Sequence, residues 1–101
     1  MIQDGDVERI ARDLLRFDAD EPWLEMSARD SAEDTLWLYL RLGTGYTRCA
    51  LSWMAILACD GDAMALVQYV SREIDGALLP LRPVVHRKFR LQTRDPKRWR
   101  K

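Results

Sequence analysis

The residues of this chain that could do chemistry are concentrated near its C-terminus, where basic and aromatic side chains are interleaved. From Arg82 to Lys101 there are nine Lys or Arg residues and one acid, which gives this stretch a charge of +8. Cations at this density suit the phosphates of a nucleic acid, because each contact releases a counterion. Phe89 and Trp99 lie inside the basic run, where their rings can stack on bases. The pattern predicts binding to DNA, RNA or another polyanion.

The predicted nucleic-acid-binding site consists of the cations and the two rings of this run. Its residues are Arg87, Lys88, Phe89, Arg90, Arg94, Lys97, Arg98, Trp99 and Arg100. Phosphate contacts and base stacking together predict binding that weakens with salt and depends little on base sequence. Within residues 84–91, apolar and basic side chains separate onto two sides, so one side can rest on protein while the other meets phosphate.

The basic run could instead bind an acidic protein or fold back on its own chain. A charged patch indicates the sign of its partner and not its identity, so an acidic protein is an alternative partner. The rest of the chain, Met1 to Leu81, has seven Lys or Arg residues and fifteen acids, a charge of −8. The basic run could therefore dock on its own acidic body. The charge pattern divides the chain into an acidic domain, residues 1–81, and a basic arm, residues 82–101.

No arrangement of residues predicts catalysis or metal binding. The single histidine, His86, lies among cations that would disfavour the cationic form of a general base, and we expect it to serve as one more donor to phosphate. No serine lies in the G-x-S-x-G motif of a nucleophile. Cys49 and Cys59 form no C-x-x-C pair, and with His86 they lack the close spacing of zinc ligands. We expect a protein that is not an enzyme and has no cofactor.

The composition is that of one small globular domain. Of 101 residues, 48% are hydrophobic and 32% are charged, which suffices for a core without a disulfide or a metal. Residues 1–20 are acidic and amphipathic, unlike a secretory leader. The longest apolar stretch, Cys49 to Cys59, is too short to cross a bilayer, and its two cysteines suit a reducing compartment. We expect a cytoplasmic protein that does not engage a membrane.

The elements that must carry the arm are predicted to be helices. Apolar residues between Val7 and Leu15 recur at the spacing of one helical stripe. Further helices are framed by residues that cap or break a helix, and they cover a short segment from Pro22, then Ala32–Leu42, Thr47–Cys59 and Ala63 to about Ile74. The predicted fold class is all-α, a bundle of four or five helices with a basic C-terminal arm.

The alternative is an α+β fold with a hairpin that includes Leu36–Leu42. In this segment leucines alternate with other residues at a period of two, and Gly43-Thr44-Gly45 could connect it to a second strand. The capping residues at both ends, and the Leu, Ala and Met content of residues 50–65, favour helices instead.

Two of the predicted helices would have too little polar surface for a domain of this size. Leu36–Leu42 and Cys49–Cys59 would be apolar nearly all round, and a small domain has few layers with which to cover them. Exposed apolar surface usually marks an interface. The alternative function is therefore a protein-interaction module, an adaptor, assembly subunit or inhibitor. It would bind a protein partner, or form a homo-oligomer, through these apolar helices or the acidic N-terminal face.

Overall fold

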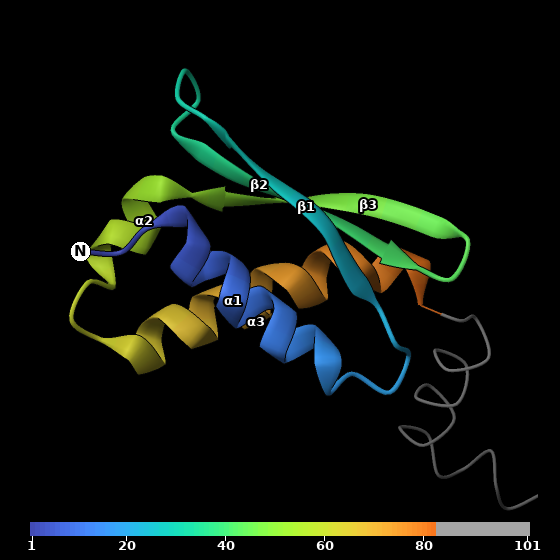
Figure 1. Cartoon of the computed structure of the whole chain (residues 1–101). Coiled ribbons are helices and arrows are strands. Elements are labelled where there is room, and N and C mark those ends of the chain that lie inside the picture. Colours follow the sequence, from blue (N-terminus) through green and yellow to red (C-terminus); the bar gives the residue numbers. More distant parts are fainter. Residues whose placement is uncertain (83–101) are drawn as a thin grey trace, which may run out of the picture.

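The computed structural model describes residues 1–82, which form one three-stranded sheet and three α-helices (Figure 1). The helices are α1 (Asp4–Arg16), α2 (Trp53–Ala58) and α3 (Ala63–Leu78), and a 3-10 turn follows at Leu79–Leu81. The strands are β1 (Trp23–Asp30), β2 (Thr35–Leu42) and β3 (Gly45–Ser52). The fold class is α+β, so the predicted all-α helical bundle is wrong.

The error lies in the middle of the chain, between Pro22 and Ser52. The short helix expected from Pro22 is β1, and the helix expected over Ala32–Leu42 is a turn followed by β2. The helix expected over Thr47–Cys59 divides at Ser52 into β3 and the short α2. The helices expected at the two ends of this region are present as α1 and α3, although α3 continues beyond Ile74 to Leu78.

The leucines of β2 explain why this region forms a sheet. Leu36, Leu38, Leu40 and Leu42 are each at most 8% exposed, whereas the residues between them are half-buried. In a helix, residues two apart point in different directions, so these leucines would be spread around the axis. In a strand they share one face and can all be buried together. The alternation at a period of two therefore outweighed the capping residues, as the hairpin alternative had it.

The sheet is an antiparallel meander with the strand order β1-β2-β3. Residues Gly43 and Thr44 connect β2 to β3, and Gly43 has a φ of +61°, in the left-handed region that favours glycine. Between Leu24 and Met26 the register of β1 against β2 shifts, which makes Glu25 an extra residue in a β-bulge.

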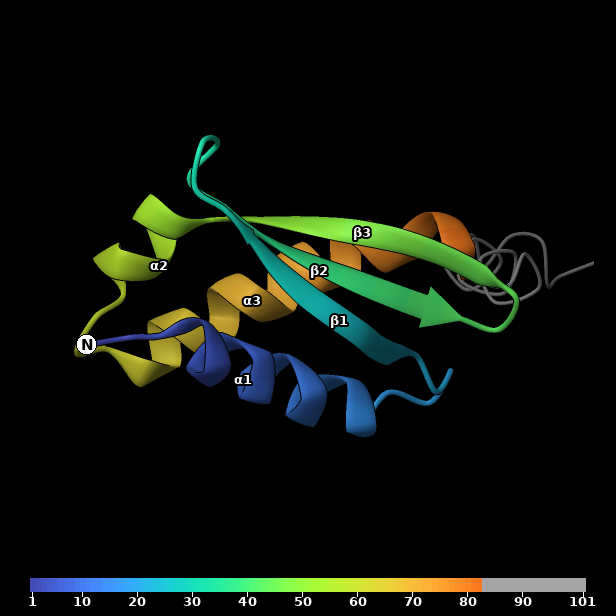
Figure 2. The ribbon, with the colours of Figure 1, turned by 45° about the horizontal axis from the view of Figure 1, so that its top comes forward.

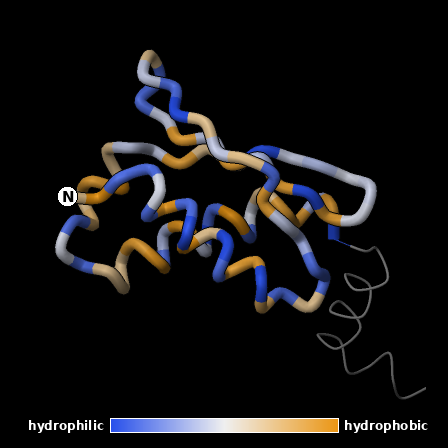
Figure 3. The backbone as a smooth tube through the Cα atoms, viewed as in Figure 1, coloured by the Kyte–Doolittle hydropathy of each residue, from blue (hydrophilic) through white to orange (hydrophobic). Residues whose placement is uncertain are grey.

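Helices α1 and α3 cover one face of the sheet, with α1 beside β1 and α3 beside β3 (Figure 2). Val7, Ala11 and Leu15 of α1 join the leucines of β2 in the core, together with a buried row on α3. That row is Leu66, Val70, Ile74 and Leu78. Hydropathy alternates along the helices and strands, as expected where each element buries one side (Figure 3).

The packing shows how this small domain covers the leucines of β2. The leucines of β2, which as a helix would have needed cover on every side, are covered by α1 and α3 of the same chain. The apolar helix expected over Leu36–Leu42 is therefore absent, and of the one expected over Cys49–Cys59 only the short α2 remains, with Met54 and Leu57 exposed. No helix in this same range combines the length and the apolar character needed to span a membrane.

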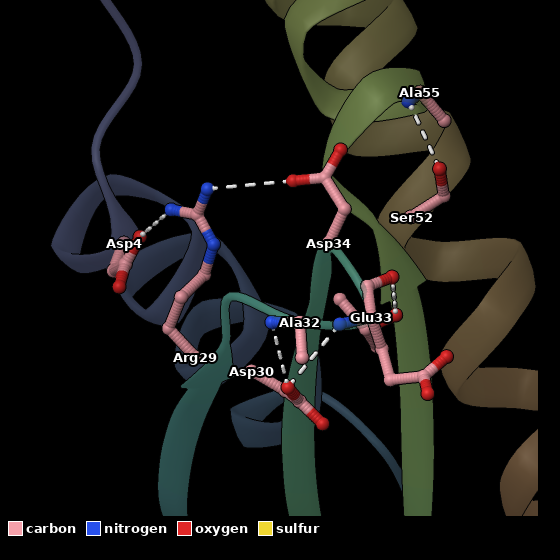
Figure 4. A network of polar contacts seen from close by, with 9 residues as sticks. Asp4, Arg29, Asp30, Ala32, Glu33, Asp34, Ser52 and Ala55 are labelled. Carbon is pink, nitrogen blue, oxygen red and sulfur yellow. Dashed lines mark hydrogen bonds and ion pairs between the residues drawn. The ribbon is translucent and has the colours of Figure 1, made fainter.

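A polar network ties α1 to the sheet near the turn between β1 and β2 (Figure 4). Arg29 of β1 pairs with Asp4 at 3.1 Å and with Asp34 at 3.7 Å. Its guanidinium carbon lies 3.7 Å from the ring centroid of Trp53, at the start of α2. One arginine therefore joins α1, the β1–β2 turn and α2.

Candidate interaction surface on the open face of the sheet

The face of the sheet turned away from α1 and α3 carries aromatic and basic side chains. Because side chains alternate along a strand, the residues between the buried leucines of β2 must point to this side. Their cross-strand neighbours in β1 and β3 point the same way. We call this surface the open face, and its residues are Trp23, Glu25, Met26, Ala28, Asp30, Thr35, Trp37, Tyr39, Arg41, Tyr46, Arg48, Ala50 and Ser52.

The strand register arranges the large side chains of the open face in three rows. Trp37 of β2 is paired with two small residues, Ala28 and Ala50, so no bulky cross-strand neighbour stands beside its ring. In the next row, Tyr39 lies between Met26 and Arg48. The third row places Arg41 between Trp23 and Tyr46. Four of the nine aromatic residues of the chain are thus on one surface.

Two arginines of the open face lie over aromatic rings. The guanidinium carbon of Arg48 is 4.2 Å from the ring centroid of Trp37, and that of Arg41 is 5.6 Å from the ring centroid of Tyr46. The negative face of an aromatic ring attracts a cation at these distances. Arg41 also donates a hydrogen bond from Nε to the carboxylate of Glu25 in the β-bulge. The planar groups of this surface are therefore held in place before any partner arrives.

Much of this surface is accessible. Tyr46 is 73% exposed, Met26 is 53% exposed and Trp23 is 47% exposed. Aromatic and methionine side chains gathered on one exposed face are typical of binding surfaces. The formal charges of the open face balance, because Glu25 and Asp30 offset its two arginines. The open face thus offers stacking surfaces, and most of the charge needed for a polyanion would have to come from elsewhere.

The predicted nucleic-acid-binding residues lie outside the described part of the chain. Arg87, Lys88, Phe89, Arg90, Arg94, Lys97, Arg98, Trp99 and Arg100 all fall within residues 83–101. His86, the expected additional phosphate donor, also falls there. The structure places none of these residues relative to the open face.

The one described residue of the basic arm is Arg82, and it is held by the acidic loop after α1. Its guanidinium donates to both carboxylate oxygens of Asp18, at 3.0 and 2.8 Å, and to Asp20 at 2.6 Å. Its side chain is only 14% exposed. The hydrogen bonds from Arg82 lower the pKa of Asp18 below its ordinary value, against the opposing effect of burial. We call these three residues the Arg82 clamp.

The Arg82 clamp fixes where the basic arm leaves the body. The preceding residue, Leu81, packs against the β2–β3 turn, because a Cβ built on Gly45 would lie 3.0 Å from its side chain. Asp18 and Asp20 lie just before β1, which begins at Trp23. The root of the arm is therefore at the end of the sheet that carries the row of Trp23, Arg41 and Tyr46.

The helical layer carries a different kind of surface. A hollow of about 250 Å³ lies between α1 and α3, lined by Ile10, Asp13, Leu14, Phe17 and Val67. It is apolar apart from Asp13, and Phe17 is 82% exposed. The four acids of α1 lie among its three arginines, so this layer carries little net charge, and the hollow could accept an apolar partner.

Residues 1–82 include the buried thiol of Cys49 and possible metal ligands among the acids and cysteines. Burial raises the pKa of Cys49 to about 12, which keeps its thiol protonated and unreactive. No three Cys, His, Asp or Glu side chains in this part of the chain are placed to hold a metal ion.

The open face was missed because its residues were assigned to helices. Its signal was nevertheless present in the sequence, as Trp37, Tyr39 and Arg41 alternate with the buried leucines. The chain matches no known protein family, and it resembles no curated protein and no solved structure.

Proposed function

We propose that this chain is a small, non-enzymatic nucleic-acid-binding protein, which uses its open face and its basic arm together. The observation that carries the proposal is the open face itself, where aromatic rings and arginines occupy all three strands. Aromatic rings stack on bases, and arginine binds phosphate or stacks as well. The proposal places the protein in the cytoplasm, where its free thiols, Cys49 and Cys59, would stay reduced.

The charge for this interaction would come from the arm. Residues 83–101 contain eight Lys or Arg residues and one acid, a charge of +7, whereas the open face is balanced. The arm is rooted at Arg82, which binds Asp18 and follows Leu81 beside Gly45, so it begins at the end of the sheet where Trp23 and Tyr46 lie. Electrostatic attraction would then supply most of the affinity, and the open face would orient the bases.

The test is removal of the arm beyond its root. A chain that stops after Arg82 keeps the Arg82 clamp, so the body should fold as before. We expect the full chain to bind a labelled oligonucleotide with an affinity that falls steeply with salt, with a slope of about −0.7 to −0.9 per phosphate contacted. The shortened chain should lose most of this affinity. Fluorescence anisotropy between about 50 and 200 mM salt measures both quantities.

A matched control is substitution of cations on the helical layer. Arg9→Gln and Arg72→Gln remove two exposed cations from α1 and α3 and should leave affinity within about two-fold. The proposal fails if no oligonucleotide is bound at low salt, or if the shortened chain binds as tightly as the full one. Circular dichroism of the shortened chain shows whether its fold is intact.

The hollow between α1 and α3 favours a second candidate function, a protein-interaction module. Its apolar lining, with Phe17 exposed at its edge, would suit an apolar segment of a partner protein. Such a complex would persist at salt concentrations that dissociate a phosphate-driven one. A partner retained on the immobilised protein at about 1 M salt, and lost from Phe17→Ala, would support this function.

A further inference from the structure

We propose that the open face binds the unpaired bases of a single-stranded nucleic acid and does not accept a duplex. The inference rests on the proposed function, because it names the form of nucleic acid that this surface takes. Each base would lie on one ring or on one guanidinium plane, and adjoining phosphates would meet Arg41 and Arg48 of the open face.

The spacing of the rings favours separated bases. Trp37 and Tyr39 are successive residues of β2 on the open face, which places their backbones about 6.8 Å apart. Tyr46 and Arg48 repeat this spacing on β3. Bases stacked in a duplex are only about 3.4 Å apart along each strand. Rings at twice that distance fit bases that have come apart from one another, as they do in an extended single strand.

A second argument against a duplex is that the rings of the open face could not reach the faces of its bases. The faces of bases in a duplex are covered by their neighbours, so a protein ring can reach them only after the base is unstacked. On the protein side, Ala28 and Ala50 leave the space beside Trp37 free of bulky cross-strand neighbours, and Tyr46 is 73% exposed. A flat base can therefore reach either ring once the arginine that lies over it moves aside.

The arginines make this surface suitable for a polynucleotide in particular. Arg48 now lies over Trp37, and a base that takes its place on the ring frees the guanidinium to bind the adjoining phosphate. Arg41 lies over Tyr46 in the same way, next to the root of the arm. Ring and cation are thus adjacent at two positions, as base and phosphate are in each nucleotide. A protein partner would use the same residue types without needing this repeat.

The experiment compares matched probes on the full chain. The probes are a labelled 12-nucleotide oligodeoxythymidylate, an oligouridylate of the same length, and a 12-base-pair duplex. The open-face variants are Trp37→Leu, Tyr46→Leu and Arg48→Lys, of which Arg48→Lys keeps the charge and loses the plane. The matched controls are Met64→Leu and Arg72→Lys, because both side chains are exposed on α3, away from the open face.

We expect the wild-type chain to bind both single strands at least ten-fold more tightly than the duplex. Each ring variant should weaken single-strand binding by about 5- to 150-fold, the range found when a stacking ring is removed. Arg48→Lys should weaken it by a smaller factor, and both controls should stay within two-fold. Tyr46→Leu is informative even if Trp37→Leu folds poorly, since Tyr46 is too exposed to support the core.

The outcomes separate this inference from the proposed function. Equal, arm-dependent binding of duplex and single strand would overturn the inference and leave the proposed function standing. Single-strand preference that survives Trp37→Leu and Tyr46→Leu would also overturn it, because the selectivity would then lie in the arm. If no probe binds at low salt, both fail.

Discussion

The two faces of strand β2 differ in burial and in the side chains they carry. One face carries Leu36, Leu38, Leu40 and Leu42, which α1 and α3 bury almost completely. The other carries Thr35, Trp37, Tyr39 and Arg41, all only half-buried. Adjacent residues of one strand thus have separate roles: the covered face provides stability, and the open face keeps large planar side chains accessible to a partner.

This separation lets the open face change without loss of the fold. Its rings are supported by cross-strand neighbours and by arginines, and not by the helices. Cross-strand pairs contribute on the order of 1 kcal/mol or less each, whereas a core leucine contributes several times more. Substitutions on the two faces should therefore separate stability from binding.

The largest expected effect comes from the covered face. Leu38→Ala should lower the free energy of unfolding by about 2–5 kcal/mol, because Leu38 is fully buried and its loss leaves a cavity. Its neighbour on the other face gives the comparison: Tyr39→Ala should cost about 1 kcal/mol. Urea unfolding followed by circular dichroism measures both. Equal losses would show that the open face is part of the core, contrary to this separation of roles.

The same alternation shows what the sequence could predict. The apolar stripe of α1 and the caps of α3 identified both helices, because each has a full-length amphipathic pattern of its own. The period of two in Leu36–Leu42 also indicated a strand, which was the alternative prediction. The prediction nevertheless favoured a helix, because Ser31 and Gly43 look like helix caps. In the structure both residues belong to the turns at the two ends of β2.

Other features depend on tertiary contacts that a local pattern does not contain. Ala50 and Leu51 have helical propensity, but they pair with Trp37 and Leu36 of β2 and so complete a strand. Ser52 ends that strand and caps α2 by accepting a hydrogen bond from Ala55. The Arg82 clamp joins residues more than sixty positions apart, at the boundary where the sequence placed the start of a free arm.

Loss of the Arg82 clamp should have an intermediate effect on stability. Arg82→Gln should lower the free energy of unfolding by about 1–3 kcal/mol near pH 7, because two carboxylates lose their hydrogen-bonded cation. The control is Arg72→Gln, whose side chain is 74% exposed and pairs with Glu73 at 3.7 Å. That change should cost no more than about 0.5 kcal/mol.

The effect of the clamp should also depend on pH. The pKa of Asp18 is lowered in the folded protein from its ordinary value of 3.8, so its contribution is fully present above that value. It is lost as the pH falls through the lowered pKa. The difference between wild type and Arg82→Gln should therefore be constant from pH 7 to about pH 5 and shrink below pH 3.8. A difference that grows in acid would mean that Asp18 is not the group stabilised by Arg82.

The smallest expected effect on stability comes from Glu25 in the β-bulge, and it separates the two faces most sharply. Glu25→Gln removes the carboxylate that binds Arg41, and both side chains are about 40% exposed, so stability should fall by less than about 1 kcal/mol. Binding should change in the opposite direction, because the open face gains one unit of positive charge and Arg41 is released for phosphate. One unit of charge within contact distance of a phosphate in water is worth about 0.5–1 kcal/mol. This predicts roughly two- to five-fold tighter binding of a single-stranded oligonucleotide at low salt.

Asp13→Asn on α1 adds the same charge to the helical layer and serves as the control. If both variants raise the affinity equally, overall charge explains the gain, and if only Glu25→Gln raises it, the gain belongs to the open face.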